Sequence, residues 1–130
     1  MITEEDKKLL LRDLCARQPY GVKCYAASYK QPYTLIGIVE DEIFLNTPIH
    51  DEGDGKFDLG HEIIKPYLRP MSYLAKMWGG LNEEEIKNPF ILFHSPLYAL
   101  DYFLENHIDF RGLIEKGLAL EAPEDMYKTE

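Results

Sequence analysis

The fold is decided by residues 33–46, which run YTLIGIVEDEIFLN. Apart from Gly37, the first seven of these residues are β-branched, aromatic or otherwise apolar, and this composition is typical of a buried strand. Gly37 inside the run indicates a bulge or a close approach of a neighbouring strand. The acidic residues 40–42 then predict a tight connection to a second strand near 43–46. Residues 33–46 therefore predict an antiparallel hairpin at the centre of a sheet.

The residues before this hairpin predict a third strand near 20–27. Val22, Cys24 and Ala26 alternate with polar or aromatic residues, so one face would be buried and Tyr25 would lie on the other. The connections are too short for crossovers, which favours an antiparallel meander. Residues 61–65 are the candidate for a fourth strand of this sheet. We therefore expect a small antiparallel sheet of three to four strands.

Two long helices flank this sheet in the sequence. Thr3 is a suitable cap for a helix that continues to about residue 18, where Pro19 ends it. Ser95 and Pro96 begin a second helix near the C-terminus. Its apolar stripe consists of side chains three and four residues apart, Leu97, Leu100, Leu104 and Ile108, and is widened by Tyr98, Tyr102 and Phe103. We expect an α+β fold in which both helices pack on one face of the sheet.

The length and composition are those of one globular domain, with 130 residues, of which 45% are hydrophobic and 28% charged. We assign residues 1–122 to a single α+β domain and expect residues 123–130 to form a mobile C-terminal tail. No apolar run approaches the ~20 residues that span a bilayer, and the N-terminus lacks the features of a signal peptide. The sequence therefore predicts a cytoplasmic protein without a membrane segment, in which Cys15 and Cys24 are buried thiols.

The net charge of −9 is concentrated in one segment. Residues 40–62 contain eight acidic residues and a single basic residue, Lys56. Such a segment repels phosphate, so direct nucleic-acid binding is disfavoured, and a cation or a basic partner is favoured instead. Within this segment, residues 47–60 form a polar, glycine-rich loop.

These features favour a non-enzymatic binding or accessory protein that needs no cofactor. Its acidic loop would engage a basic protein, and exposed tyrosines on the sheet would add rigid contact area. The candidate binding residues are two tyrosines and four carboxylates: Tyr25, Tyr29, Asp51, Glu52, Asp54 and Asp58. The plainer interpretation of the same residues is a solvated loop and a sheet face covered by tyrosines.

The alternative function is that of a small metal-dependent hydrolase. The loop resembles a calcium-binding loop, but His50 and His61 occupy the positions of the first and last acidic ligands. A mixed site would then have to use His50, His61 and Glu62, which lack a standard zinc spacing. A further group near the C-terminus consists of His107, Asp109 and Arg111. We expect Asp109 and Arg111 to cap or pair locally there.

Three stretches of the chain are similar to a known set of proteins. They are DLCAR at 13–17 with PYGVKC at 19–24, IKPYLRP at 64–70, and NHIDFRGLI at 106–114 with GLALEA at 117–122. Together they resemble uncharacterised small proteins encoded by gut Bacteroidales and their phages or mobile elements. The resemblance implies a bacterial or phage cytoplasmic origin and carries no activity and no site residues. Residues 47–60 lie outside it, so we expect the acidic loop to be peculiar to this chain.

Overall fold

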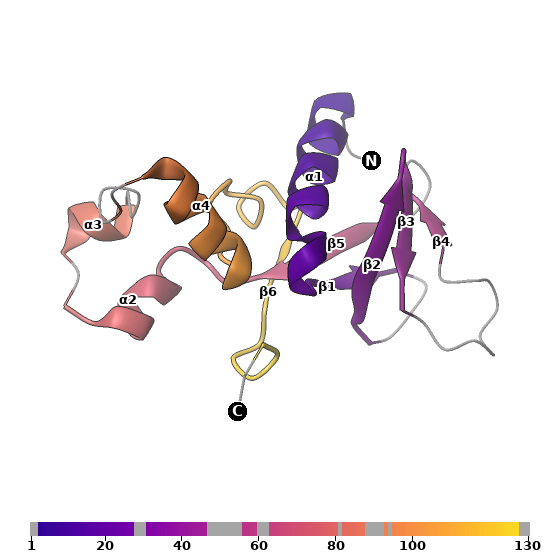
Figure 1. Ribbon diagram of the computed structural model, residues 1–130. Helices are drawn as coiled ribbons and strands as arrows, with labels where there is room; N and C mark the ends of the chain where they lie inside the picture. Colours follow the sequence, from indigo (N-terminus) through magenta and orange to yellow (C-terminus); the bar gives the residue numbers. More distant parts are fainter. Residues whose placement is uncertain are drawn as a thin grey trace.

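The protein has an α+β fold, and in its described residues helices are combined with a six-stranded sheet (Figure 1). The sheet is mixed, so the predicted class is confirmed while the predicted sheet was too small. The computed structural model describes residues 3–27, 31–46, 56–59, 63–80, 82–87, 93 and 95–127.

The strand order in the sheet is β4-β3-β2-β1-β5-β6. The predicted hairpin is formed by β2 and β3, and β1 continues the sheet beside β2. Neighbouring strands are antiparallel except β5 and β6, which are parallel. The strands are β1 (Lys23–Ala26), β2 (Tyr33–Val39), β3 (Glu42–Leu45), β4 (Lys56–Asp58), β5 (Ile64–Leu68) and β6 (Leu120–Glu121).

The two strands that we did not predict form the edges of the sheet. β4 lies inside the predicted loop 47–60, and β6 lies shortly before the predicted tail. With three and two residues, these strands are too short for an alternating pattern to be recognised. In addition, β6 pairs with β5, which is distant in the sequence. Contacts in the folded structure, and not local sequence patterns, therefore identify β4 and β6 as the edge strands.

The predicted irregularity at Gly37 is a β-bulge. Leu35 pairs with Leu45, but Gly37 pairs with Phe44, so Ile36 is the extra residue in β2. A Cβ atom at Gly37 would lie 3.9 Å from the Phe44 Cβ atom, an ordinary van der Waals distance. The bulge leaves Ile36 facing outward, with 54% of its surface exposed.

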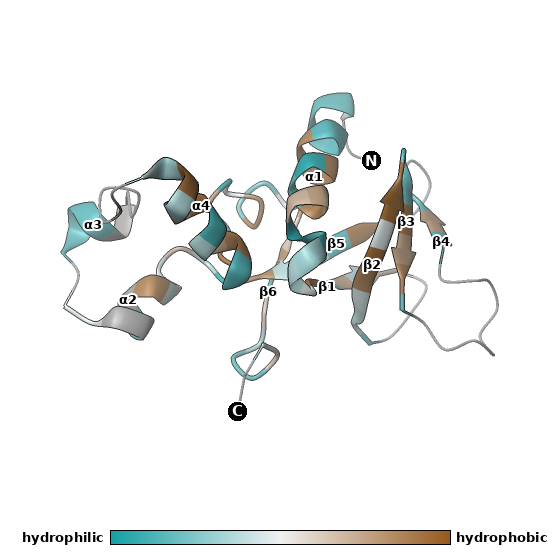
Figure 2. Cartoon of the chain, viewed as in Figure 1, coloured by the Kyte–Doolittle hydropathy of each residue, from teal (hydrophilic) through white to brown (hydrophobic). Residues whose placement is uncertain are grey.

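The main hydrophobic core lies between the sheet and α1 (Glu4–Arg17), which ends in a 3₁₀ turn (Gln18–Tyr20). Leu10 and Leu14 of α1 are buried in this core. Thr3 Oγ1 accepts a hydrogen bond from the Asp6 N–H group at 3.1 Å, so the predicted helix cap is confirmed. Figure 2 shows the hydrophobic residues of β2 and β3 and the hydrophilic first turn of α1. The strands and the residue before β1 contribute Val22, Cys24, Ala26, Leu35, Ile43, Leu45, Phe57, Ile64 and Leu68 to the core.

The C-terminal helix does not cover the sheet as we expected. In Figure 1, α4 (Pro96–Glu105) lies beside α1, towards α2 (Tyr73–Trp78) and α3 (Glu83–Lys87). Its Ala99 and Phe103 form a second, smaller hydrophobic cluster with Leu74 and Ile108. Two residues of the predicted apolar stripe, Leu104 and Ile108, are buried, whereas Leu97 at the start of the helix is 74% exposed. None of the helices in the described ranges has the length and apolar character needed to cross a bilayer.

The two cysteines differ in their environment. Cys24 is buried in the core, as predicted, and burial raises the pKa of its thiol. Cys15 was predicted to be buried but is exposed. The reason is the helical register, because the buried face of α1 is formed by residues 10, 13, 14 and 17.

We expect one thiol per chain to react with a maleimide in the native protein and two after unfolding. Cys15 should react first because only an accessible thiol can form a reactive thiolate. Mass spectrometry of the labelled peptides measures this directly. Labelling of Cys24 before Cys15 would contradict the assigned faces of α1 and β1.

Candidate functional site

The structure describes two of the six predicted binding residues, Tyr25 and Asp58. The other four lie outside the described residues: Tyr29, Asp51, Glu52 and Asp54. The same holds for the alternative metal ligands His50, His61 and Glu62. Among the residues that are described, no three His, Cys, Asp or Glu side chains form a group that could hold a metal ion.

Acidic side chains from three elements meet at one end of the sheet. Lys7 of α1 forms an ion pair with Asp41 of the β2–β3 turn, with 2.7 Å between Nζ and Oδ2. The Asp41 carboxylate raises the pKa of Lys7, and the charges of Glu4 and Asp58 add to this effect. Glu4 belongs to α1 and Asp58 to β4. The fold therefore gathers carboxylates that are far apart in the sequence around a single lysine.

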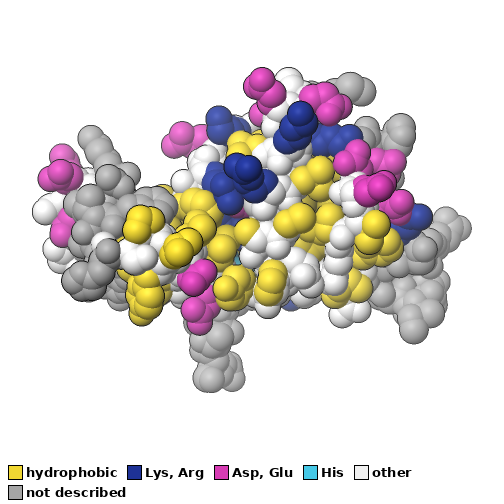
Figure 3. All heavy atoms as spheres, turned by 45° about the horizontal axis from the view of Figure 1, so that its top comes forward, with side chains coloured by type: hydrophobic (Ala, Val, Ile, Leu, Met, Phe, Trp, Pro, Cys, Tyr) yellow, Lys and Arg dark blue, Asp and Glu magenta, His cyan; other side chains and the backbone are white. Residues whose placement is uncertain are grey.

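Two further carboxylates complete this acidic surface. Glu40 is exposed at the β2–β3 turn, and Glu42 of β3 pairs with Lys56 of β4 at 2.7 Å. Val39, which precedes them at the end of β2, is 59% exposed. Figure 3 shows acidic side chains gathered over this end of the molecule, beside hydrophobic ones. We call this surface the acidic rim: Glu4, Glu40, Asp41, Glu42 and Asp58 with Lys7 and Lys56, a formal net charge of −3.

The sheet face that points away from the core carries a different surface. On β1, Cys24 and Ala26 are buried, so Lys23 and Tyr25 point to the other face, as expected for Tyr25. Lys65 and Tyr67 have the same orientation on β5. Tyr25 is directly opposite Lys65, and the same register brings Lys23 opposite Tyr67. We call these four half-buried side chains the Lys–Tyr block, in which lysine and tyrosine alternate: Lys23, Tyr25, Lys65 and Tyr67.

A buried network of charged groups was not predicted from the sequence. Asp13 and Arg17 of α1 are fully buried and form an ion pair at 2.7 Å between Oδ2 and Nε. Arg17 Nη2 also donates to the Ile108 carbonyl oxygen at 2.6 Å. Arg111 Nε donates to the other Asp13 oxygen at 3.0 Å. These hydrogen bonds hold the segment after α4 against α1. They also pair the buried charges, whose removal from water would otherwise be strongly destabilising.

The side chains of Asp109 and Arg111 are both used in folding contacts. The Asp109 carboxylate accepts hydrogen bonds from the N–H groups of Leu113 and Ile114, at 2.8 and 2.9 Å. This is the local capping that we predicted. Arg111 differs from the prediction because it pairs with Asp13, which is remote in the sequence. Its guanidinium also lies 4.7 Å from the centre of the Phe110 ring.

His107 is held against the C-terminal segment. Its ring stacks on the Tyr127 ring, with 3.7 Å between the ring centres. Burial lowers the pKa of His107 to about 4, and the charges of Arg17 and Arg69 act in the same direction. His107 is therefore neutral near pH 7, and its buried Nδ1 atom has no hydrogen-bond partner among the described residues.

Tyr127 also closes the end of the β1–β5 ladder. Its hydroxyl group accepts a hydrogen bond from the Lys23 N–H group and donates one to the Tyr67 carbonyl oxygen, both at 2.8 Å. Arg69 donates to the Tyr127 carbonyl oxygen at 3.2 Å. We expected a mobile tail from residue 123 onward. Its described part, 123–127, contacts the sheet through Tyr127, and residues 128–130 lie outside the described residues.

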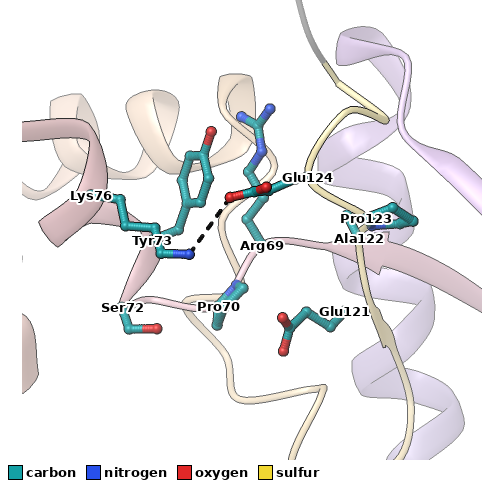
Figure 4. Close-up of a pocket in the computed structure, with 9 residues that line it drawn as sticks. All are labelled: Arg69, Pro70, Ser72, Tyr73, Lys76, Glu121, Ala122, Pro123 and Glu124. Carbon is teal, nitrogen blue, oxygen red and sulfur yellow. Dashed lines mark ion pairs between the residues drawn. The ribbon is translucent and has the colours of Figure 1, made fainter.

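A pocket of about 210 Å³ lies between the start of α2 and the C-terminal segment (Figure 4). In its wall, the Arg69 guanidinium is already engaged with the Asn106 and Tyr127 carbonyl oxygens. Lys76 and Glu124 face each other with 3.8 Å between their charged atoms, and both are largely exposed. Solvated charges of both signs therefore line the pocket, and this mixture selects no single class of ligand.

Three stretches of the chain, 13–24, 64–70 and 106–122, pack against one another. Asp13 and Arg17 come from the first stretch and bond to the third. In the second stretch, Arg69 exchanges backbone hydrogen bonds with His107 and Asp109, at 2.7 and 2.8 Å. The hydrogen bonds of these residues thus stabilise the fold, and they do not indicate a catalytic role.

Comparison with protein-family models, with curated proteins and with solved structures finds no match to this chain. The functional assignment therefore depends on the acidic rim.

Proposed function

We propose that the protein is a cytoplasmic, non-enzymatic binding protein that engages a basic partner through the acidic rim. The observation that carries this proposal is the meeting of carboxylates from α1, the β2–β3 turn and β4 around Lys7. The exposed Val39 directly precedes this turn. The predicted loop carboxylates Asp51, Glu52 and Asp54 join β3 to β4 in the sequence, so we include them in the binding surface. The two cysteines are free, which fits a reducing compartment.

The physical argument rests on charge and on an apolar contact. Lys7 and Lys56 each neutralise one carboxylate, and the rim keeps a net charge of −3. Charges of one sign attract an opposite partner over roughly 8–10 Å at moderate ionic strength and mainly accelerate association. Val39 adds an apolar surface that is desolvated on contact. A lysine-rich segment with apolar side chains is complementary to such a surface.

The test is the association rate of a labelled peptide of alternating lysine and leucine, measured by stopped-flow fluorescence. A rim variant combines Glu40→Gln, Asp41→Asn, Glu42→Gln and Asp58→Asn. We expect this variant to bind the peptide about tenfold more slowly at low salt, and to lose most of the salt dependence. The fold should persist because exposed ion pairs contribute only about 0–1 kcal/mol each.

A matched control separates the rim from the overall charge. It combines Glu83→Gln, Glu84→Gln, Asp101→Asn and Glu105→Gln, which are exposed carboxylates on α3 and α4. Both variants change the net charge from −9 to −5. The control should bind the peptide nearly as fast as the wild type. If both variants bind the peptide equally slowly, or if neither variant is slower than the wild type, the assignment to the rim is overturned.

A further inference from the structure

The chain after β6 is fixed to the sheet through Tyr127. We call residues 123–127 the strap, which is drawn in yellow between β6 and the C-terminus in Figure 1. Its first three residues, 123–125, are all exposed. Glu124 among them faces Lys76 at 3.8 Å, but both side chains are solvated, and such a pair contributes little to stability. The strap is therefore held chiefly by the contacts of one residue.

The anchor at Tyr127 consists of a few directional contacts. Its hydroxyl group bridges two main-chain groups at the end of the β1–β5 ladder, the Lys23 N–H group and the Tyr67 carbonyl oxygen. Its ring stacks on His107, and its own carbonyl oxygen accepts a hydrogen bond from Arg69. A surface segment that is held by so few contacts opens locally more often than the core unfolds.

His107 makes the closed strap sensitive to protons. The Tyr127 ring lies on the imidazole, and only 7% of the His107 surface is exposed. In the imidazolium form both ring nitrogens are donors, but the buried Nδ1 atom has no hydrogen-bond partner among the described residues. A protonated ring under the strap therefore carries a buried donor without an acceptor, which is destabilising.

The surroundings of His107 act in the same direction. Burial lowers the pKa of the imidazole, and so do the charges of Arg17 on α1 and Arg69 after β5. The Asp109 carboxylate, on the same segment, is engaged by two N–H groups of the following turn. The other titratable groups, on the strap and on β1, stay neutral in acid because burial raises their pKa values: Tyr127 and Cys24. Opening of the strap removes the burial of His107 but leaves the two arginines in place.

We propose that the strap is a proton-sensitive cover, which detaches from the otherwise folded protein when His107 gains a proton. Detachment lets water reach the imidazolium, and it uncovers the Lys23 N–H group and the Tyr67 carbonyl oxygen. The main core keeps its contacts, because all of its buried residues lie outside the strap. The inference goes beyond the proposed function, since the acidic rim includes none of these residues.

The experiment is amide hydrogen exchange of the full chain, followed by NMR at pH 7 and at pH 4.5. Lys23 donates its N–H group to the Tyr127 hydroxyl and therefore reports on the strap. Leu35 donates to the Val22 carbonyl oxygen at 2.9 Å and reports on the core. We expect Lys23 to be less protected than Leu35 at both pH values, because the strap opens without the core.

The protection of Lys23 should also depend on pH. Its protection factor, corrected for the intrinsic pH dependence of exchange, should fall by up to roughly 60-fold from pH 7 to pH 4.5. The reason is that the pKa of His107 is about 4 under the closed strap and rises towards its ordinary value of 6.5 when the strap opens. Protons therefore favour the open strap between these two values.

Two variants separate the strap from the rest of the protein. In His107→Asn, the protection factor of Lys23 should hardly change with pH, because this position gains no proton. In Tyr127→Ala, the pKa of His107, followed through the shifts of its ring protons, should rise from about 4 towards 6.5 because the cover is absent. Leu35 should stay protected in Tyr127→Ala, since the strap contributes no buried residue to the core.

Each measurement has an outcome that contradicts the inference. Equal protection factors for Lys23 and Leu35 at both pH values mean that the strap opens only when the core unfolds, and they overturn the inference. A fall in Lys23 protection that is as large in His107→Asn as in the wild type overturns the role of His107. An unchanged pKa of His107 in Tyr127→Ala shows that the strap does not bury the imidazole, and it overturns the inference as well.

Discussion

Asp13→Ala is expected to lower the free energy of unfolding by about 3–5 kcal/mol, the largest effect of any single substitution proposed for this protein. The reason is the position of Arg17, whose guanidinium is fully buried and has Asp13 as its only anionic partner among the described residues. Removal of the carboxylate leaves this charge unpaired in the core. It also releases Arg111, which bonds to the second Asp13 oxygen. Urea unfolding followed by circular dichroism measures the change.

The matched control is Asp41→Ala. The Lys7–Asp41 pair has the same 2.7 Å separation as the Asp13–Arg17 pair but lies at the surface. We expect Asp41→Ala to cost no more than about 1 kcal/mol, because water screens an exposed pair. The double variant Asp13→Leu with Arg17→Met should recover much of the loss, since no buried charge remains. Equal effects of Asp13→Ala and Asp41→Ala would contradict the role of burial.

The central part of the fold could be predicted because its signals are local. The apolar run at 33–39 and the alternation at 22–26 define β2 and β1 without any tertiary information. The N-cap at Thr3 and the helix break before Pro19 likewise depend on neighbouring residues only. The hairpin, the first helix and the bulge at Gly37 were therefore predicted from short windows of sequence.

The parts that were not predicted depend on contacts between distant segments. β4 and β6 form strands because they pair with β3 and β5, respectively. The position of α4 away from the sheet has the same origin, because Phe103 packs in one cluster with Leu74, which belongs to α2. A helical wheel indicates an apolar face but not the element that this face packs against.

The spacing of residues in α1 contains a signal of the buried ion pair. Leu10, Asp13, Leu14 and Arg17 follow the spacing of one helix face, and all four are buried. Charged residues on an apolar stripe indicate a buried polar contact, since an unpaired charge is excluded from a core. The same argument would have excluded Cys15 from the buried face. The bonding partners Ile108 and Arg111 could not be predicted, because nothing local connects them to α1.

The candidate site was predicted only in its local components. The acidic turn at 40–42 and the outward face of Tyr25 are visible in the sequence. This turn comes close to Glu4 and Asp58 only in the folded structure, and the same holds for the pairing of Tyr25 with Lys65. Charge segregation along the sequence therefore predicted the kind of surface, and the sheet order was needed to define its residues.

The second large effect concerns pH, and it depends on His107. The pKa of His107 is lowered from 6.5 to about 4 in the folded protein by burial and by the charges of Arg17 and Arg69. Between these two values the unfolded chain binds a proton that the folded chain does not bind. Stability therefore falls as the pH decreases from about 6.5 to about 4, and it is recovered above this range. We expect a loss of about 2–3 kcal/mol between pH 7 and about pH 4.5.

Other carboxylates also titrate at low pH, so the effect is measured against a His107→Asn variant. His107 has a φ of 59°, and asparagine tolerates this left-handed conformation better than most residues. The variant cannot gain a proton at this position, but it keeps the backbone geometry beside Tyr127. The difference in unfolding free energy between the wild type and the variant should shrink as the pH falls, because only the wild type carries the cost of keeping an imidazole neutral. Parallel pH profiles for the two proteins would show that the His107 environment does not favour the neutral ring.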